Sequence, residues 1–485
     1  MSLKLYNSLT RREENFEPVE PGKVRIYCCG VTVYDYCHLG HARSYIVWDT
    51  VRRYLISRGY QVRYVQNFTD IDDKILNRAR EQNSSMEEVS ERFIKEYFVD
   101  MDRLNIMRAD EYPRATHTLN GITRLIHELE QKGYAYPAGG DVYYTVRKFA
   151  DYGKLSGRKF DDMDAGASGR LTEDSEEQKK QDPFDFALWK GAKEGEPFWE
   201  SPWGKGRPGW HIECSAMVRQ CLGETIDIHC GGADLIFPHH ENEIAQSEAV
   251  TGQSLAKYWM HNGFVTVNAE KMSKSLGNFT TIRELLERLE PMALRLFVLM
   301  AQYRKPIDFT DDAIASARNG WTTLKEGLSF GYQYGNQWGW KLEPIDDISL
   351  LENDAVQQFT DAMDNDFNTA IALGVLFELA KELRREKNIV EHGGKIETPG
   401  EVLNKKWLTL VKLANILGLE FAPEVDTEEA KEGLSDGEIE ELIAQRKAAR
   451  NAKNFAESDR VRDLLKSQGI TLIDQKDGTT IWRKN

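Results

Sequence analysis

The first part of the chain alternates between β-rich and helical segments, and this pattern restricts the fold most. Residues 23–34 (KVRIYCCGVTVY) are apolar and β-branched, as expected of a buried strand, and residues 61–67 (QVRYVQN) have a similar character. Between them, residues 42–58 carry apolar side chains at helical spacing. The sequence therefore predicts a βαβ unit of a parallel sheet and an α/β fold of the Rossmann type.

A His-Leu-Gly-His motif, residues 38–41, falls between the first strand and the helix. Open α/β sheets bind ligands at this edge, and the N–H groups of a helix N-terminus favour anionic phosphate. Gly40 permits the close approach of a flat base, and His38 and His41 can donate hydrogen bonds to phosphate oxygens as charge develops there. The simpler alternative is a pair of ordinary loop histidines.

A second motif, Lys271-Met272-Ser273-Lys274-Ser275, follows past the middle of the chain. Lys271 and Lys274 belong to a loop that also contains Gly277, so both lysines could reach a triphosphate and neutralise the departing pyrophosphate. Alone, the motif could be a solvated basic turn. Together with His38 and His41 it predicts an enzyme that activates a carboxylate with ATP.

The chain is too long for one typical domain, because 485 residues with 41% hydrophobic side chains can bury several cores. We expect an α/β catalytic domain, an insertion within it, a helical bundle and a small C-terminal mixed α/β module. The expected ranges are 1–99 and 200–264 for the two halves of the catalytic domain, 100–199 for the inserted α/β subdomain, 265–305 for the region bearing the lysine motif, 306–421 for the helical bundle, 422–441 for an acidic linker and 442–485 for the basic module.

Within these ranges the local patterns predict particular elements. The sheet should resume near Pro208, with a strand over residues 225–229, a turn over 230–234 and a helix through 244–250. Residues 161–182, rich in glycine and charge, are expected to form a mobile loop. Further helices are expected over 282–290, 292–301, 312–328 and, after a cap at Asn368, over 369–387.

Composition argues against a membrane or secreted protein. No stretch reaches the roughly eighteen apolar residues of a membrane span, and Arg295 interrupts the closest run. The first twenty residues lack the apolar core of a secretion signal, and six irregularly spaced cysteines do not form a disulfide framework. A soluble, cytoplasmic protein with reduced thiols is expected.

Charge is distributed unevenly along the chain. The net charge of −15 argues against a generally basic nucleic-acid coat. Residues 442–485 nevertheless contain ten basic and five acidic side chains, after a segment of strongly acidic composition. The C-terminal module is therefore the part of the chain best suited to nucleic-acid phosphates.

A metal site is also suggested by residue types. His239 and Glu243 are four positions apart in a predicted helix, hence on one face, and Cys214 could complete a site with a cysteine from the first strand. The residues alone do not choose between Cys28 and Cys29, or between His239 and His240. Buried structural cysteines are the alternative.

Residues 38–41 and 271–275 resemble the HIGH and KMSKS signatures of class I aminoacyl-tRNA synthetases, with Leu39 in place of isoleucine. Four longer stretches resemble, more specifically, the cysteinyl-tRNA synthetase family. They are residues 29–35 (CGVTVYD), 69–74 (TDIDDK), 208–217 (PGWHIECSAM) and 237–243 (FPHHENE). The resemblance covers essentially the whole chain, with the motifs in the expected order.

This resemblance implies one zinc ion, whose softness lets a substrate thiolate enter as a further ligand and a serine hydroxyl be rejected. It also implies the substrates L-cysteine, ATP with Mg²⁺, and tRNA(Cys), in a protein expected to be a monomer. The implied residues are Cys29, Cys214, His239 and Glu243 for zinc, Thr69, Trp210 and His229 for the amino acid, and His38, Gly40, His41, Gly232, Asp234, Lys271 and Lys274 for ATP, the histidines and lysines being catalytic.

The C-terminal half is expected to bind tRNA, with the stem contacted by the region of residues 265–305 and by the bundle, and the anticodon read by residues 442–485. Candidate contact residues are Arg446, Arg450, Lys453, Arg460 and Trp482. The alternative for this module is a solvated amphipathic helix and one packed tryptophan.

Two other functions remain open at this point. One is a ligase of mycothiol synthesis that passes activated cysteine to an amino sugar, which the bundle and basic module disfavour. The other is a non-catalytic, zinc-dependent tRNA-binding protein, which would have no need of both histidines and both lysines.

Overall fold

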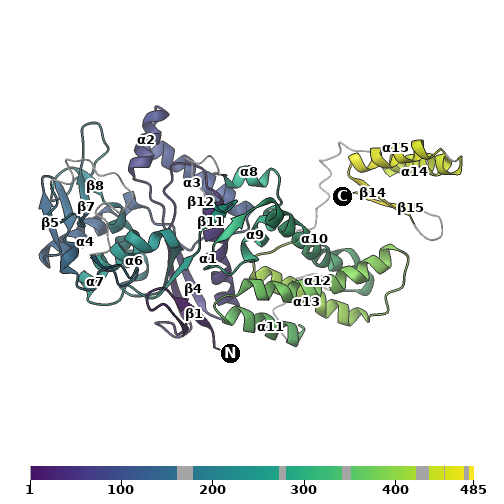
Figure 1. The fold of residues 1–485 in the computed structure, drawn as a ribbon, viewed down its shortest axis with the longest axis horizontal. Coiled ribbons are helices and arrows are strands. Elements are labelled where there is room, and N and C mark those ends of the chain that lie inside the picture. Colours follow the sequence, from purple (N-terminus) through teal and green to yellow (C-terminus); the bar gives the residue numbers. More distant parts are fainter. Residues whose placement is uncertain are drawn as a thin grey trace. The chain divides into compact units, whose positions relative to one another are not determined.

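The computed structural model describes residues 2–160, 179–271, 280–340, 351–421, 436–452, 454–474 and 480–484 (Figure 1). The chain divides into two compact units. The first comprises Met1–Trp321, Asp354–Val375 and Leu413–Glu420, and the second comprises Thr322–Asn353, Leu376–Lys412 and Phe421–Asn485. Residues of the expected bundle, 306–421, occur in both units, and the domain boundaries stay predictions.

A four-stranded parallel sheet lies at the centre of the first unit, in the order β10-β9-β3-β4. Its strands are β3 (Lys23–Cys28), β4 (Gln61–Gln66), β9 (Ile226–Gly232) and β10 (Ala256–Asn262). Helix α1 (Leu39–Ser57) connects β3 to β4, so the predicted βαβ unit is confirmed. Because all four strands are parallel, their carboxyl ends share one edge, and the residues that follow each strand meet there.

The first strand is shorter than predicted, since it ends at Cys28 and not at Tyr34. A Cβ atom on Gly30 would lie 1.6 Å from the carbonyl oxygen of Asn67, so the two chains approach each other too closely there for any other residue. Beyond this point Val33 N–H donates to Thr69 O (3.2 Å), and Thr69 N–H to Val31 O (3.1 Å). These hydrogen bonds join the loop that follows β3 to the loop that follows β4 at the carboxyl edge of the sheet.

The inserted subdomain has its own antiparallel sheet, β5-β6-β7-β8, beside helix α4 (Leu119–Gln131) (Figure 1). Its strands are β5 (Ala135–Ala138), β6 (Asp141–Tyr144), β7 (Phe186–Gly191) and β8 (Gly206–Pro208). The prediction that the central sheet resumes near Pro208 is wrong, because β8 pairs with β7 and Gly206 packs against the Trp189 indole. Of the expected loop 161–182, residues 161–178 lie outside the described residues.

Helices α6 (Trp210–Leu222) and α7 (Glu241–Thr251) flank β9 in sequence. The turn predicted over 230–234 begins later, because Cys230–Gly232 still belong to β9 and pair with β10. Helix α7 includes the predicted range 244–250. Two further helices, α2 (Asp73–Glu81) and α3 (Met86–Arg103), follow β4, and the hairpin of β1 (Lys4–Asn7) and β2 (Arg12–Asn15) precedes β3.

A small sheet, β12-β11-β13, follows the central one. Its strands are β11 (Val265–Val267), β12 (Glu270–Lys271) and β13 (Ile307–Phe309). Helices α8 (Ile282–Leu286) and α9 (Pro291–Leu299) lie between β12 and β13, in the predicted places but shorter. Pro291 separates α9 from α8, because proline starts a helix readily and keeps the residue before it extended.

Arg295, which interrupts the apolar run of α9, is fully buried. It forms an ion pair with Asp49 and donates to the carbonyls of Leu417 (2.7 Å) and Leu104 (3.1 Å). No helix in the described ranges is long and apolar enough to cross a membrane.

Helices dominate the rest of the chain. They are α10 (Asp311–Tyr334), α11 (Asn353–Asp364), α12 (Thr369–Glu391) and α13 (Gly400–Ile416). The predicted Asn368 cap is confirmed, because its Oδ1 accepts from Ile371 N–H (3.2 Å). In the second unit, the Trp407 indole donates to Leu328 O (2.8 Å) and lies over Gly331 of α10.

The C-terminal module consists of α14 (Asp436–Asn451), α15 (Phe455–Ser467), β14 (Ile470–Asp474) and β15 (Thr480–Lys484). Its core contains Ile439, Val461, Leu465 and Ile470. The prediction of a linker over 422–441 is therefore wrong for its last six residues, since α14 begins at Asp436 and buries Ile439 completely. Residues 422–435 lie outside the described part of the chain.

The packing of Gly331 leads to a stability prediction. A Cβ atom at Gly331 would lie 2.2 Å from the Trp407 ring, so Gly331→Ala should lower the free energy of unfolding by about 1–3 kcal/mol. The control is Gly374→Ala, at an exposed position of α12 with nothing within 4 Å, which should raise it by about 1 kcal/mol. Thermal unfolding of both variants checks this, and a Gly331→Ala protein as stable as wild type would contradict the packing.

Candidate active site

Four buried side chains converge at the carboxyl edge of the central sheet. They are Cys29 just after β3, Cys214 on α6, His239 just before α7 and Glu243 on its first turn. Their ligand atoms all lie within 4.8 Å of one another. The Sγ atom of Cys29 lies 3.9 Å from that of Cys214 and 3.5 Å from Glu243 Oε1, and His239 Nε2 lies 3.1 Å from the same Oε1.

This geometry brings Cys29, and not Cys28, into the cluster, and it brings both His239 and His240 close to Glu243. Cys29 faces the cluster, whereas Cys28, the last residue of β3, lies opposite Cys230 in the neighbouring strand. His239 contacts Glu243, although not on a regular helix as predicted, because Phe237 is extended and α7 begins at Glu241. His240 belongs to a second, overlapping group with Cys29, His229 and Glu243.

The electrostatics of the cluster oppose the ordinary effect of burial. Burial raises the pKa of Glu243, but the charges of His229 and His239 and their hydrogen bonds outweigh it and lower the pKa to about 2. Burial lowers the pKa of His239, but Glu243 and Cys214 raise it to about 9. The hydrogen bond from Cys29 lowers the pKa of Cys214 to about 6, against the effect of burial. Two sulfurs, one imidazole and one carboxylate in this arrangement match the donor atoms that zinc prefers.

A second layer of histidines surrounds these four residues. Glu243 Oε2 lies 2.9 Å from His229 Nε2, and His239 Nδ1 lies 2.9 Å from His211 Nδ1. His240 Nδ1 lies 2.8 Å from His261 Nε2, whose other ring nitrogen lies 2.8 Å from Ser8 Oγ. Sequence reasoning gave no role to His211 or His261, and it considered His240 only as the alternative to His239. His211 and His240 stand inside quoted motifs, whereas nothing near His261 in the sequence marks it.

The three residues predicted for the amino-acid pocket differ in whether they contact this cluster. The Trp210 ring stacks on His239, with centroids 4.2 Å apart, and His229 stacks on Trp259 at 4.4 Å while it contacts Glu243. Thr69 follows β4 at the same sheet edge, where its backbone pairs with Thr32. Trp210 and His229 thus contact the cluster directly.

His38 and His41 are built into the start of α1. His38 caps the helix, and its Nδ1 accepts from Gly40 N–H (3.0 Å) and His41 N–H (3.4 Å). In return, His41 Nδ1 accepts from His38 N–H (3.3 Å), and the two rings stack 3.6 Å apart. Because both Nδ1 atoms accept, the proton of each neutral ring is on Nε2. This explains why the helix begins three residues earlier than predicted.

The chain that flanks the lysine motif is attached at both ends. Lys271 pairs through its backbone with Thr266 in the small sheet, whereas Lys274 and the rest of 272–279 lie outside the described residues. After this gap, Thr280 O accepts from Leu39 N–H (3.3 Å), and Ile282 N–H donates to Cys37 O (2.9 Å). Segments more than two hundred positions apart therefore meet at the His-Leu-Gly-His loop.

Gly232 and Asp234 occupy the end of β9 and the turn that follows it. A Cβ atom on Gly232 would lie 2.4 Å from Asp234 Oδ1, so the absence of a side chain lets the carboxylate fold back over the strand end. This places an acceptor at the shared carboxyl edge, as a ribose-binding role requires.

The predicted tRNA contacts differ in exposure within the C-terminal module. Arg450 and Arg460 are exposed, and Arg460 pairs with Glu457 (2.7 Å). Arg446 is buried, and Trp482 packs against the module core. Lys453 lies outside the described residues. Arg446 and Trp482 thus help to build the module itself.

Comparison with known proteins decides the family. Residues 15–319 match the model of the tRNA synthetases class I (C) catalytic domain, and residues 358–422 match the DALR domain. The cysteine–tRNA ligase of Gloeothece citriformis (strain PCC 7424) is 68% identical over 486 aligned residues, covering 100% of both chains. That of Trichodesmium erythraeum (strain IMS101) is 66% identical, again over 100% of both.

The chain belongs to the cysteine–tRNA ligase family. The resemblance inferred from the motifs is confirmed, and with it the class of the enzyme, an aminoacyl-tRNA synthetase. These relatives support a tRNA ligase and give no support to the ligase of mycothiol synthesis.

Solved structures of other synthetases share the fold of this family member. Methionyl-tRNA synthetase of Mycobacterium tuberculosis with methionyl-adenylate has a TM-score of 0.55 at 16% identity, over 81% of this chain and 89% of that one. A LeuRS–tRNA–LeuAMS complex of Agrobacterium radiobacter K84 has a TM-score of 0.58 at 13% identity, over 83% and 85%. At such low identity the likeness concerns the fold, and it confirms the predicted α/β class I architecture.

The buried histidine layer predicts how stability depends on pH. Burial, followed by the charge of His229, lowers the pKa of His261 from 6.5 to about 3. Unfolding therefore takes up a proton below pH 6.5, and the stability that the neutral ring contributes is lost as pH falls from 6.5 towards 3, by about 1.4 kcal/mol per pH unit for one proton. In His261→Gln this part of the slope should disappear.

Thermal unfolding between pH 4 and pH 7 measures that slope. The control is His127→Gln, at an exposed position of α4, which should keep the wild-type slope. Equal slopes in His261→Gln and wild type would show that the His261 ring is not held neutral.

Proposed function

We propose that this chain carries out the cysteine–tRNA ligase reaction with a zinc-binding selector and a separate adenylation site at the same sheet edge. The observation that supports it best is the convergence of Cys29, Cys214, His239 and Glu243 beside the strand that leads into His38 and His41. The selector recognises the substrate side chain, and the histidines and lysines act on the phosphates.

Zinc would be held by the two thiolates, the imidazole and the carboxylate of this cluster. When bound, it supplies a further coordination position for the substrate thiolate, which a serine hydroxyl fills poorly. A site built around one such strong polar contact can discriminate by about 10⁴ to 10⁵, so proofreading becomes unnecessary. His211 and His229, bonded to His239 and Glu243, orient the ligands, and the stacked Trp210 holds the His239 ring.

Adenylation follows from the placement of the charged groups. The substrate carboxylate attacks the α-phosphate of Mg-ATP, the bond to the β-phosphate breaks, and pyrophosphate leaves. His38 and His41 donate from Nε2 to the phosphate oxygens, and Lys271 and Lys274 neutralise the leaving group. Gly40 and Gly232 give the adenosine close access to the backbone, and Asp234 accepts from its ribose hydroxyls.

Transfer needs no protein nucleophile. The 2′-hydroxyl of the terminal ribose of tRNA(Cys) attacks the carbonyl of cysteinyl-adenylate, and AMP leaves as the ester forms. Positioning and electrostatic stabilisation carry the chemistry in both steps. We place this reaction in the cytoplasm, where the charged tRNA is used, and we expect a monomer.

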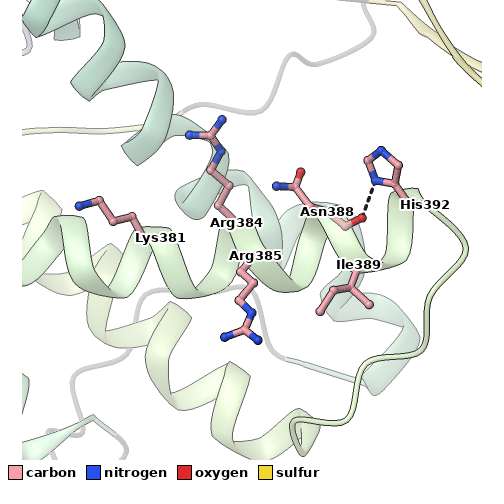
Figure 2. A pocket seen from close by; sticks show the side chains of 6 residues that line it. All are labelled: Lys381, Arg384, Arg385, Asn388, Ile389 and His392. Carbon is pink, nitrogen blue, oxygen red and sulfur yellow. Dashed lines mark hydrogen bonds between the residues drawn. The ribbon is translucent and has the colours of Figure 1, made fainter.

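Two surfaces suit the tRNA backbone. One is the basic module over 442–485. The other is a groove on α12 lined by Lys381, Arg384, Arg385, Asn388, Ile389 and His392, with no acidic side chain among them (Figure 2). Arg384 is held by Glu326, and His392 Nδ1 lies 2.8 Å from Asn388 O within the same helix. Phosphate contacts at either surface would be weakened by salt.

The selector is tested by cysteine-dependent ATP–pyrophosphate exchange, with and without tRNA and a zinc chelator. Wild type should exchange with cysteine but not with serine, and should lose zinc and activity together under the chelator. Cys214→Ala should lose zinc and lower exchange by more than about 100-fold, because a ligand and not an outer residue is removed.

The control for this variant is Cys221→Ala, a half-buried thiol near Glu111 and outside the cluster, which should keep both zinc and exchange. A Cys214→Ala enzyme with normal zinc content and normal exchange would contradict the proposed site. Wild type that binds tRNA but never exchanges pyrophosphate would instead favour the non-catalytic tRNA-binding protein.

The C-terminal module and the rest of the chain should separate in function. The C-terminal module has its own core, so removal of residues 436–485 should leave pyrophosphate exchange intact and greatly reduce the charging of tRNA. Parallel measurements of exchange and charging on the truncated protein check this. Equal loss of both activities would contradict the division of roles.

A further inference from the structure

Arg43 is a buried cation in the first turns of α1, two residues after His41. Only 1% of the residue is exposed. Its guanidinium donates to three backbone carbonyls, those of Phe264, Tyr303 (3.0 Å) and Lys305. One side chain thereby joins α1 to two other segments of the first unit.

Main-chain oxygens accept from the two terminal nitrogens of this guanidinium, whereas its buried Nε has no partner among the described residues. In the described ranges no carboxylate forms an ion pair with Arg43, unlike Arg295, which contacts Asp49. Burial lowers the pKa of Arg43 to about 10. A buried charge is retained only when its partners are well placed, so the three carbonyls and the guanidinium hold one another in position.

The three carbonyls mark the place where two chain segments cross. Gly263 N–H donates to Tyr303 O (2.8 Å), and Ile307 N–H donates to Phe264 O (3.0 Å). A Cβ atom on Gly263 would lie 2.7 Å from Lys305 O, so glycine permits the close approach. Arg43 binds this crossing from the side of α1.

The crossing leads directly into the small sheet. Phe264 immediately precedes β11, and Lys305 lies two residues before β13, which pairs with β11 in parallel. The other neighbour of β11 is β12, in which Lys271 lies opposite Thr266. A short chain of contacts therefore runs from His41 through Arg43 and β11 to the backbone of Lys271.

We propose that Arg43 is a positioning residue that sets the distance between the His38–His41 pair and the strand bearing Lys271. Its effect on turnover rests on the proposed function, in which the histidines and Lys271 act on the same triphosphate. The planar guanidinium has donors on two nitrogens to span carbonyls of separate segments, whereas a lysine ammonium is a point charge. Arg43→Lys keeps the charge and removes this geometry.

Arg43→Lys should lower kcat for cysteine-dependent pyrophosphate exchange by about 100-fold, the effect of a shift of about 1 Å between groups that must act together. KM for cysteine should not change, because the cysteine-binding cluster does not involve this sheet. The matched control is Arg295→Lys, another buried arginine, on α9, that donates to carbonyls, but to those of Leu417 and Leu104 and not to the crossing. It should lower the thermal midpoint and leave kcat of the folded protein unchanged.

Hydrogen–deuterium exchange tests whether Arg43 holds the small sheet in position, and it does not depend on catalytic turnover. Arg43→Lys should speed amide exchange in 263–271 and 303–309 and leave β9 unaffected, while Arg295→Lys should not affect these segments. Unchanged amide exchange in residues 263–271 of Arg43→Lys, or equal losses of kcat in the two variants, would overturn the proposal. A wild type inactive with cysteine would refute the proposed function, and hydrogen exchange would still decide whether Arg43 holds the sheet.

Discussion

The carboxylate of Glu243 has no exposed surface, and much of the first unit is arranged around it. A buried charge is costly unless polar or oppositely charged groups surround it. Here His229 lies against one oxygen, and His239 and Cys29 lie against the other. These partners come from β9, the turn before α7 and the end of β3, so the charge is stabilised once β3 and β9 pair and α7 packs beside them.

The same sheet edge supports the other half of the site. Cys29 and the His38 cap both follow β3. The carboxyl end of β3 lies beside those of β4 and β9, because the three strands are parallel. The capping bonds of His38 and His41 fix the orientation of both rings. In the proposed reaction, selection of sulfur and stabilisation of phosphate charge would therefore occur at neighbouring points of one sheet edge, which is the preorganisation that catalysis by positioning requires.

Local sequence predicted the parts of the fold that depend on local physics. The βαβ unit follows from hydrophobic periodicity, and the Asn368 cap follows from side-chain chemistry. Strand β8 could not be assigned from its own residues, because pairing with β7 decides to which sheet Pro208 belongs. The start of α14 was missed because acidic composition concealed the apolar spacing that begins at Ile439.

The candidate site shows the same limit. The choice of Cys29 over Cys28 depends on which face of β3 meets α6, and only the packed structure decides that. His261 was missed altogether, because its role comes from contact with His240 and Ser8, far away in sequence. Histidines in a layer of this kind are recognised by tertiary contacts and not by spacing.

Zinc X-ray absorption with and without L-cysteine tests whether zinc held by the Glu243 cluster binds the sulfur of the substrate directly. We expect two sulfur ligands in the zinc-loaded protein and three after cysteine is added, with no change on addition of serine. An unchanged sulfur count with saturating cysteine, in a protein that still activates cysteine, would show that the zinc does not bind the substrate sulfur.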